Sequence, residues 1–522
     1  MKTNFHHLLS DAVLAYPNNR ALSSDAVTLT YRELWLSALG VKSALEQMAL
    51  ARQDRVAIYL DKRLETVSAL FGASAAGGIF VPINPLLRPS QVSFILADSG
   101  ARVLVTSAER LNQLADCLGT CPDLRHVLLV DGAGDLPVLP NVDVHGWPAA
   151  LAPQRHHAEG HTLDVDLAAI LYTSGSTGKP KGVALSHRNL LAGAESVSHY
   201  LANSERDVIL AALPLSFDAG LSQITTGFLV GAHVVLLNYV IPQDVPRICQ
   251  RHGVTGITAV PPLWIQLAEL NWPEEARNNL RYFANTGGRM PRALLGRLRE
   301  QFPRALPFLM YGLTEAFRST YLDPSEIDRR PSSIGKAIPN TEILVVRPDG
   351  SPCDPGEQGE LVHRGALVAQ GYWNDPARTA ERFRPVPGRD QPWRSAELAV
   401  FSGDLVIRDD EGFLYYVGRN DEMIKTSGYR VSPTEVEEAA FDTRLVVDAV
   451  AVGVDDDRLG QKIVLIASPA GSGPLDVVGL LSQMKQRLPL YMVPAVVIER
   501  AAIPRSPNGK FDRVLLRQEL AA

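Results

Sequence analysis

The first half of the chain alternates short apolar runs with longer stretches of helical periodicity. Residues 55–60 and 79–83 are apolar runs of strand length, whereas residues 31–50 and 62–76 repeat apolar side chains at helical spacing. We expect Ser90 to cap the next helix. Strand–helix–strand units of this length build parallel sheets covered by helices on both faces. The alternation therefore predicts an α/β fold, and it returns at residues 168–172, 208–213, 232–238 and 256–260.

After about residue 334 the pattern changes to short strands and tight turns. The pairs Asp349-Gly350 and Glu411-Gly412 indicate hairpins, which predicts a small β-rich subdomain. The last hundred or so residues mix strands and helices and predict a small α+β unit, with helices at 435–441 and 475–488 and strands at 446–454 and 463–468. Residues 131–160 are rich in Pro, Gly and His with little periodicity, and we interpret them as a surface excursion.

Composition excludes several classes of protein. A chain of 522 residues with 46% hydrophobic and 21% charged residues is long enough for several cores and is not disordered or fibrous. The net charge of −6 argues against nucleic acid as a partner. No apolar stretch is long enough to span a membrane, and the N-terminus reads as an amphipathic helix, so we expect a cytoplasmic protein. Four cysteines favour a reducing compartment over a disulfide framework, and the pair Cys117 and Cys121 is too small a set for zinc.

Residues 171–182, LYTSGSTGKPKG, are the most informative segment. They follow an apolar strand and contain four Ser or Thr hydroxyls, three glycines and two lysines. Glycines let backbone N–H groups approach an anion, and hydroxyls and lysines add donors, so the segment predicts a phosphate-binding loop. It is not a Walker loop, because the glycine spacing is too short and Pro180 follows where a helix would begin. A solvated linker is the alternative, but linkers rarely carry this combination.

This loop resembles the signature loop of the adenylate-forming superfamily, which includes acyl-CoA synthetases, the amino-acid adenylation domains of peptide synthetases and beetle luciferases. Four further motifs resemble that family in the same order. They are Tyr311-Gly-Leu-Thr-Glu315, Ser402-Gly-Asp404, the segment 418–435 that begins Gly418-Arg-Asn-Asp, and Pro504-Arg-Ser-Pro-Asn-Gly-Lys510. The resemblance covers nearly the whole chain.

The resemblance implies a two-step reaction that needs ATP and Mg²⁺. A carboxylic acid attacks the α-phosphate of ATP, and a thiol of CoA or of a carrier-protein pantetheine then displaces AMP. The implied catalytic residues are Lys510, Thr314 and Glu315, with Glu315 also the metal ligand. The implied nucleotide-binding residues are Thr173, Ser174, Gly175, Ser176, Thr177, Gly178, Lys179, Gly287, Gly288, Tyr311, Gly312, Asp404 and Arg419, with the Tyr311 ring against adenine and Asp404 on the ribose.

The resemblance also implies a moving C-terminal part. It divides the chain into an N-terminal AMP-binding region, residues 1–418, and a C-terminal lid, residues 419–522, with a hinge near Asp421. Gly428 and Arg430 match positions near the tunnel for the thiol arm, where a glycine permits close backbone approach. The chain ends twelve residues after Lys510, so we expect any acceptor carrier protein to be a separate chain.

The acid pocket carries the expectation about substrate. Phe217-Asp218 resembles amino-acid adenylation domains, whose aspartate binds the substrate ammonium, and a carboxylate buried without a partner is costly. Arg318 matches a pocket-lining position and could pair with a second carboxylate, and Thr286 could add a hydroxyl. Together they favour an amino acid that is acidic or a β-amino acid. The alternative is that Asp218 and Arg318 pair with each other, or that Arg318 points outward.

We therefore predict an AMP-forming acid–thiol ligase that favours an amino acid. The alternative within that class is an ordinary acyl-CoA synthetase for a fatty or aryl acid. A luciferase-like oxygenase and a binding protein without activity are further alternatives, and the complete set of motifs disfavours the second of these.

Overall fold

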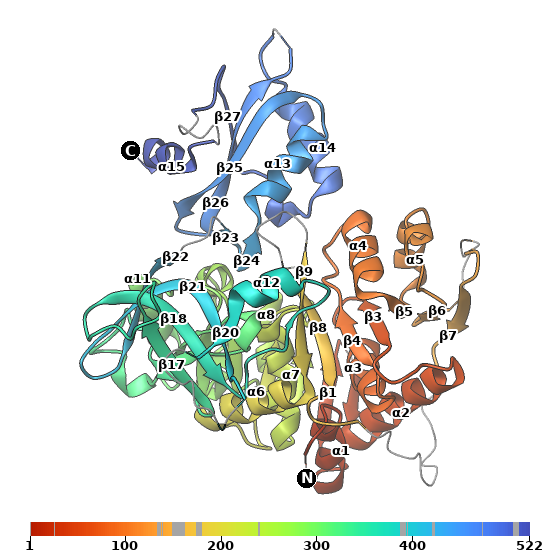
Figure 1. The fold of residues 1–522 in the computed structure, drawn as a ribbon. Coiled ribbons are helices and arrows are strands. Elements are labelled where there is room, and N and C mark those ends of the chain that lie inside the picture. The colour runs from red at the N-terminus through yellow and green to blue at the C-terminus, as the bar shows by residue number, and fades with distance from the viewer. Residues whose placement is uncertain are drawn as a thin grey trace.

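The computed structural model describes residues 2–25, 27–132, 137, 139–148, 162–173, 180–238, 241–386, 393, 395–419, 423–471, 473–504 and 511–521. Two mostly parallel sheets form its centre (Figure 1). Among the described helices, none is both long and apolar enough to traverse a bilayer. The N-terminal segment forms helix α1 (His7–Ala15), as the sequence predicts.

The first sheet has eight strands in the order β19-β9-β8-β4-β3-β5-β6-β7. The pairs from β8 through β7 in this order are parallel, and β9 and β19 add an antiparallel edge. Helices α3, α4, α5 and α6 lie between strands of this sheet in the sequence. The bounds are β3 (Arg55–Tyr59), α3 (Leu64–Ala75), β4 (Ile79–Pro82), α4 (Pro89–Ser99), β5 (Ala101–Thr106), α5 (Ala108–Leu114), β6 (His126–Leu129), β7 (Asp143–Gly146), β8 (Leu167–Thr173), β9 (Lys181–Ser186), α6 (His187–Tyr200) and β19 (Gly371–Tyr372).

The second sheet has nine strands in the order β16-β15-β14-β13-β12-β10-β11-β1-β2. Its six central strands are parallel. The bounds are β1 (Arg20–Ser24), β2 (Val27–Thr30), α2 (Tyr31–Gln47), β10 (Val208–Ala211), α7 (Asp218–Val230), β11 (His233–Leu236), α8 (Asp244–His252), β12 (Gly256–Ala259), α9 (Pro261–Ala268), α10 (Glu274–Asn279), β13 (Tyr282–Asn285), α11 (Arg292–Gln301), β14 (Leu306–Tyr311), β15 (Thr320–Leu322) and β16 (Lys336–Ala337).

Three apolar layers pack against these two sheets, one between them and one on the outer face of each. Helices α1, α2, α3, α6 and α7 contribute to one core with residues of both sheets, so they lie between the sheets. Helices α4 and α5 cover the outer face of the first sheet, and α8, α9, α10 and α11 cover the outer face of the second. Helix α2 begins where the sequence supplies a capping box, in which Thr30 and Glu33 satisfy each other's backbone N–H groups.

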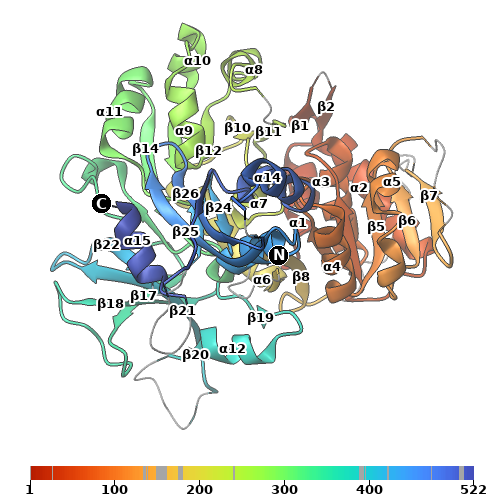
Figure 2. The ribbon, with the colours of Figure 1, turned by 90° about the horizontal axis from the view of Figure 1, so that it is seen from above.

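Two smaller sheets follow. The first is antiparallel and contains β17 (Thr341–Val346), β18 (Gln358–Gly365), β20 (Phe383–Pro385), β21 (Leu398–Arg408) and β22 (Leu414–Arg419), with α12 (Pro376–Arg382) beside it. The second contains β23 (Ile424–Thr426), β24 (Tyr429–Val431), β25 (Val446–Asp456), β26 (Gly460–Pro469) and β27 (Val496–Glu499), with α13 (Pro433–Phe441), α14 (Val477–Arg487) and α15 (Arg513–Ala521). This C-terminal unit lies over the two large sheets (Figure 1). Figure 2 shows the molecule from above, with this unit toward the viewer.

The predicted fold class is confirmed, and two local predictions are wrong. Helix α4 begins at Pro89 with Arg88 as its N-cap, because proline fits the first helical turn; Ser90 therefore lies inside the helix. The segment expected to be a surface excursion contributes strand β7, which extends the first sheet by pairing with β6. Periodicity missed β7 because its four residues, Asp-Val-His-Gly, lie at a sheet edge and are mostly exposed.

Candidate active site

A cavity of about 550 Å³ opens where the two large sheets meet the C-terminal unit. Its walls include residues at the carboxyl ends of parallel strands: Thr173 ends β8, and Thr286 and Gly312 follow β13 and β14 directly. Open parallel sheets bind ligands at this end of their strands, because the loops there converge. From the other side the β23–β24 hairpin closes the cavity with Gly428 and Arg430.

Asp218 and Arg318 form an ion pair in the cavity wall. Arg318 Nη1 lies 2.8 Å from Asp218 Oδ2, and Thr314 Oγ1 donates to Asp218 Oδ1 over 3.3 Å. The Arg318 side chain is 2% exposed and that of Asp218 is 14% exposed. Burial raises the pKa of Asp218, and the charge of Arg318 opposes this shift. Of the arrangements considered from the sequence, the outward-pointing arginine is wrong, and the mutual pair is what the structure contains.

The backbone around Arg318 explains how a large cation enters this wall. Phe317 has a φ of +56°, a conformation that non-glycine residues rarely adopt, and its carbonyl accepts from Arg318 Nη1 at 3.2 Å. Gly312 passes so close that a Cβ there would lie 3.0 Å from the Phe317 carbonyl oxygen. Arg318 Nε is buried and has no hydrogen-bond partner among the described residues. The guanidinium therefore retains a donor for a further acceptor.

The carboxylate of Glu315 lies in a second polar cluster. Its Oε1 accepts from Lys181 Nζ at 2.8 Å and from the Tyr372 hydroxyl at 2.7 Å. Burial alone would raise the pKa of Glu315, but the charges of Lys181 and Arg430 and the two hydrogen bonds together hold it well below its usual range. Glu315 is therefore a buried, ionised carboxylate. Sequence reasoning did not identify Lys181 or Tyr372, and only the second lysine of the predicted phosphate loop was a signal for either.

Asp404 and Tyr311 are also in contact. The Tyr311 hydroxyl donates to Asp404 Oδ2, and Asp404 is 2% exposed yet contributes to the cavity wall. In the antiparallel pair of β21 and β22, the backbone of Asp404 lies opposite that of Arg419. Phe217 and Thr286 line the same cavity, so the predicted acid-pocket residues and Asp404 surround one space.

Thr173 is the one residue of the phosphate-loop set that the structure describes. Its Oγ1 is buried at the cavity wall without a hydrogen-bond partner among the described residues, as expected for a donor that awaits a ligand. Ser174, Gly175, Ser176, Thr177, Gly178 and Lys179 lie outside the described residues, as do Asp421, Lys510 and the side chain of Arg419.

Gly428 and Gly287 meet in the cavity from opposite sides. Gly428 has a φ of +81°, and a Cβ there would lie 2.9 to 3.1 Å from three atoms of the Val260 side chain. Gly287 has a φ of +73°, and its Cβ would lie 4.0 Å from the Gly428 carbonyl oxygen. Gly288 packs against Pro261. Both positive φ values and the close approach favour glycine at positions 287 and 428.

Two further ionisable groups lie in the cavity wall. Lys62 Nζ donates to the carbonyl oxygens of Ala212 and Leu213, and burial lowers the pKa of Lys62 to about 7. Glu435 of α13 accepts from Gln91 of α4 at 2.7 Å, and burial raises the pKa of Glu435 to about 7. Lys62 does not stand out in sequence, and Glu435 ends the motif segment 418–435 without any local signal of its contact with Gln91, which lies far away in the chain.

The chain belongs to the AMP-binding enzyme family: the family's sequence profile matches residues 9–373, and the profile of its C-terminal domain matches residues 435–510. The resemblance to the adenylate-forming superfamily is thereby confirmed, and so is the class, a ligase of the AMP-binding type. Enzymes of this family use ATP and Mg²⁺, with CoA or a carrier-protein pantetheine as acceptor.

The chain is similar to parts of large synthetases and to a CoA synthetase of about its own length. Malpinin synthetase from Mortierella alpina is 30% identical over 98% of the chain, and surfactin synthase subunit 2 from Bacillus subtilis is 28% identical over 97%. The chain spans only 7% and 14% of these proteins. Among solved structures, the o-succinylbenzoate CoA synthetase of Bacillus subtilis is 27% identical. A double mutant of that enzyme bound to a CoA product analogue matches the structure with a TM-score of 0.82, covering 98% of this chain and 97% of that one. The same enzyme bound to its acyl-adenylate matches with a TM-score of 0.67, covering 98% of each chain.

Proposed function

We propose that the protein activates a carboxylic acid with ATP and passes the acyl group to a pantetheine thiol. The carboxylate oxygen attacks the α-phosphorus, pyrophosphate leaves, and the resulting acyl-adenylate is cleaved by the thiol with release of AMP. The observation that carries the proposal is the shared cavity, which Thr173, Asp404, the Asp218–Arg318 pair and Gly428 all line. The chain has only four cysteines, and none of them lines this cavity. We therefore propose that the protein works in the reducing cytoplasm.

The nucleotide side of the cavity fits the proposed co-substrate. Asp404 supplies a carboxylate for the ribose hydroxyls, and Thr173 supplies a buried hydroxyl for a phosphate oxygen. Thr314 is close enough to the acid pocket to donate to the α-phosphate when the acid is bound. We assign the remaining phosphate contacts to residues 174–179, and the cation that stabilises the developing charge to Lys510.

Glu315 fits the proposed role of Mg²⁺ ligand in its chemistry. A hard cation requires an ionised oxygen ligand, and the low pKa of Glu315 provides one. Both described hydrogen bonds go to Oε1, so we propose that Oε2 faces the metal. When bound, Mg²⁺ would neutralise phosphate charge, while Lys181 and Tyr372 hold the carboxylate in position.

On the acid side we propose a substrate that carries an ammonium group. Two features support this: Asp218 lies at the first turn of α7 in the cavity wall, and the segment Phe217-Asp218 resembles that of amino-acid adenylation domains. An acidic amino acid would place its ammonium on Asp218 and its second carboxylate on Arg318, which exchanges one internal pair for two pairs with the ligand.

One observation favours the second candidate, an ordinary acyl-CoA synthetase. Because Arg318 already neutralises Asp218, the aspartate does not require an ammonium ligand to be stable in the wall. A fatty or aryl acid would leave this pair intact and occupy the apolar part of the cavity.

We propose that the described arrangement of the C-terminal unit serves thiol transfer. The hairpin with Gly428 and Arg430 closes the cavity, and the higher TM-score to the CoA-analogue complex than to the acyl-adenylate complex of the same enzyme supports this assignment. The unit, proposed as residues 419–522, would turn about Asp421 between the two half-reactions.

The test is an ATP–pyrophosphate exchange screen over amino, β-amino, dicarboxylic, aryl and fatty acids. The active acid is then offered with CoA and, separately, with holo carrier proteins, and the thioester is detected by mass. Exchange with an amino acid supports the favoured substrate, and exchange with fatty or aryl acids alone supports the second candidate. Absence of exchange with every class would overturn the proposed activity.

A further inference from the structure

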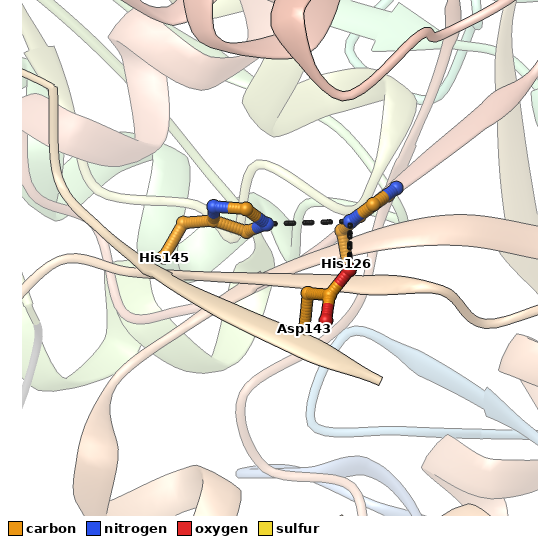
Figure 3. A group of neighbouring side chains, drawn as sticks. All are labelled: His126, Asp143 and His145. Carbon is orange, nitrogen blue, oxygen red and sulfur yellow. Dashed lines mark hydrogen bonds and ion pairs between the residues drawn. The ribbon is translucent and has the colours of Figure 1, made fainter. Parts of the chain in front are cut away.

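Three potential metal ligands meet at the far edge of the first sheet. His126 begins strand β6, and Asp143 and His145 lie on the edge strand β7. The parallel register pairs His126 with Asp143 and Leu128 with His145. Residues two apart on a strand share a face, so Asp143 and His145 point to the same side as the His126 ring (Figure 3). None of the three lines the catalytic cavity.

Their distances match a coordination sphere. His126 Nδ1 lies 3.3 Å from His145 Nε2 and 3.8 Å from Asp143 Oδ2, and the three ligand atoms lie within 4.8 Å of one another. In a tetrahedral zinc site with metal–ligand bonds of about 2.0–2.1 Å, neighbouring ligand atoms are about 3.3 Å apart. The nitrogen pair already has this spacing, and a small rotation of the exposed Asp143 side chain would bring its oxygen to the same distance.

The facing ring nitrogens of His126 and His145 can share either a proton or a cation. At 3.3 Å two imidazole lone pairs repel unless a proton or a cation is shared.

The three side chains are accessible to an ion, and one of them is a carboxylate. The Asp143 side chain is 78% exposed and that of His126 is 15% exposed, so an ion can enter from solvent and meet a carboxylate first. Two imidazoles and one carboxylate suit borderline divalent ions such as Zn²⁺ and leave a position for water. We propose that His126, Asp143 and His145 form a binding site for a divalent transition-metal ion that fastens edge strand β7 to β6.

The experiment uses untagged full-length protein, stripped with chelator and titrated with Zn²⁺ against a chromophoric chelator. We expect His126→Ala and His145→Gln each to lower the Zn²⁺ affinity of this site by about tenfold or more, and Asp143→Asn to lower it by less. The matched control is His199→Ala, because His199 is an exposed histidine on α6 outside the cluster. X-ray absorption of the one-equivalent complex should show two imidazole ligands in wild type and one in either histidine variant.

A second readout separates binding from misfolding. Zn²⁺ should raise the melting temperature of wild type and of His199→Ala but not of His145→Gln, while ATP–pyrophosphate exchange stays the same in all of them. Equal zinc affinity and equal thermal shifts in wild type and His145→Gln would overturn the site. Loss of exchange in the variants together with loss of zinc binding would overturn its independence from the catalytic cavity.

Discussion

The Asp218–Arg318 pair permits a quantitative test of how the acid pocket is built. Asp218→Ala leaves the Arg318 guanidinium, only 2% exposed, without the carboxylate that lies 2.8 Å away. Removing one partner of a buried pair costs about 3–5 kcal/mol, because the remaining charge is poorly solvated. Arg318→Leu removes the other charge, and the double variant Asp218→Ala/Arg318→Leu removes both. We expect the double variant to be less destabilised than the sum of the two singles by about 2–4 kcal/mol.

Urea unfolding followed by tryptophan fluorescence measures this coupling. All six tryptophans precede residue 419, so the signal reports the region that contains the pair and not the C-terminal unit. The control is the exposed pair of Arg299 and Asp328, with side chains 44% and 76% exposed, for which Asp328→Ala should leave the free energy of unfolding nearly unchanged. If Asp218→Ala costs no more than Asp328→Ala, the pair is not desolvated in solution and the reasoning about the pocket fails.

Three further predictions concern the half-reactions. Gly428→Ala should slow thioester formation while pyrophosphate exchange persists, because its Cβ would crowd Val260; Gly253→Ala, with a φ of +66° and open space around it, carries the backbone cost alone and should leave both steps unchanged. Lys510→Ala should reduce exchange by about a hundredfold or more but spare transfer from preformed acyl-adenylate, and unchanged pyrophosphate release would remove it from the mechanism. Burial raises the pKa of Glu435 to about 7, so its stabilising contribution is present at low pH and is lost as pH rises through 7, by roughly 3 kcal/mol; Glu435→Gln should flatten the melting-temperature profile between pH 5 and about pH 8.

The sequence predicts what local patterns encode. Strand and helix periodicity predicted the parallel sheets, and the resemblance assigned Asp218 and Arg318 to the acid pocket and Asp404 to the ribose, three residues that line one cavity. It could not predict the bond between Lys181 and Glu315, whose partners lie 134 positions apart, nor decide whether Arg318 would pair with Asp218. Such choices depend on where side chains meet after two sheets pack, and no local pattern records this.

The β23–β24 hairpin and the two flanks of the segment that contains Lys510 belong to different parts of the same small unit. Gly428, on the β23–β24 hairpin, lines the cavity. Phe511, which follows Lys510, packs against a separate cluster with Ile503 and residues of β25 and β26, and Pro504 accepts a hydrogen bond from Asp512. Neither flank of the Lys510 segment lines the cavity in this arrangement. If the unit presents one part at a time, Gly428→Ala and Lys510→Ala act on separate steps, and their effects on the two half-reactions should combine without coupling.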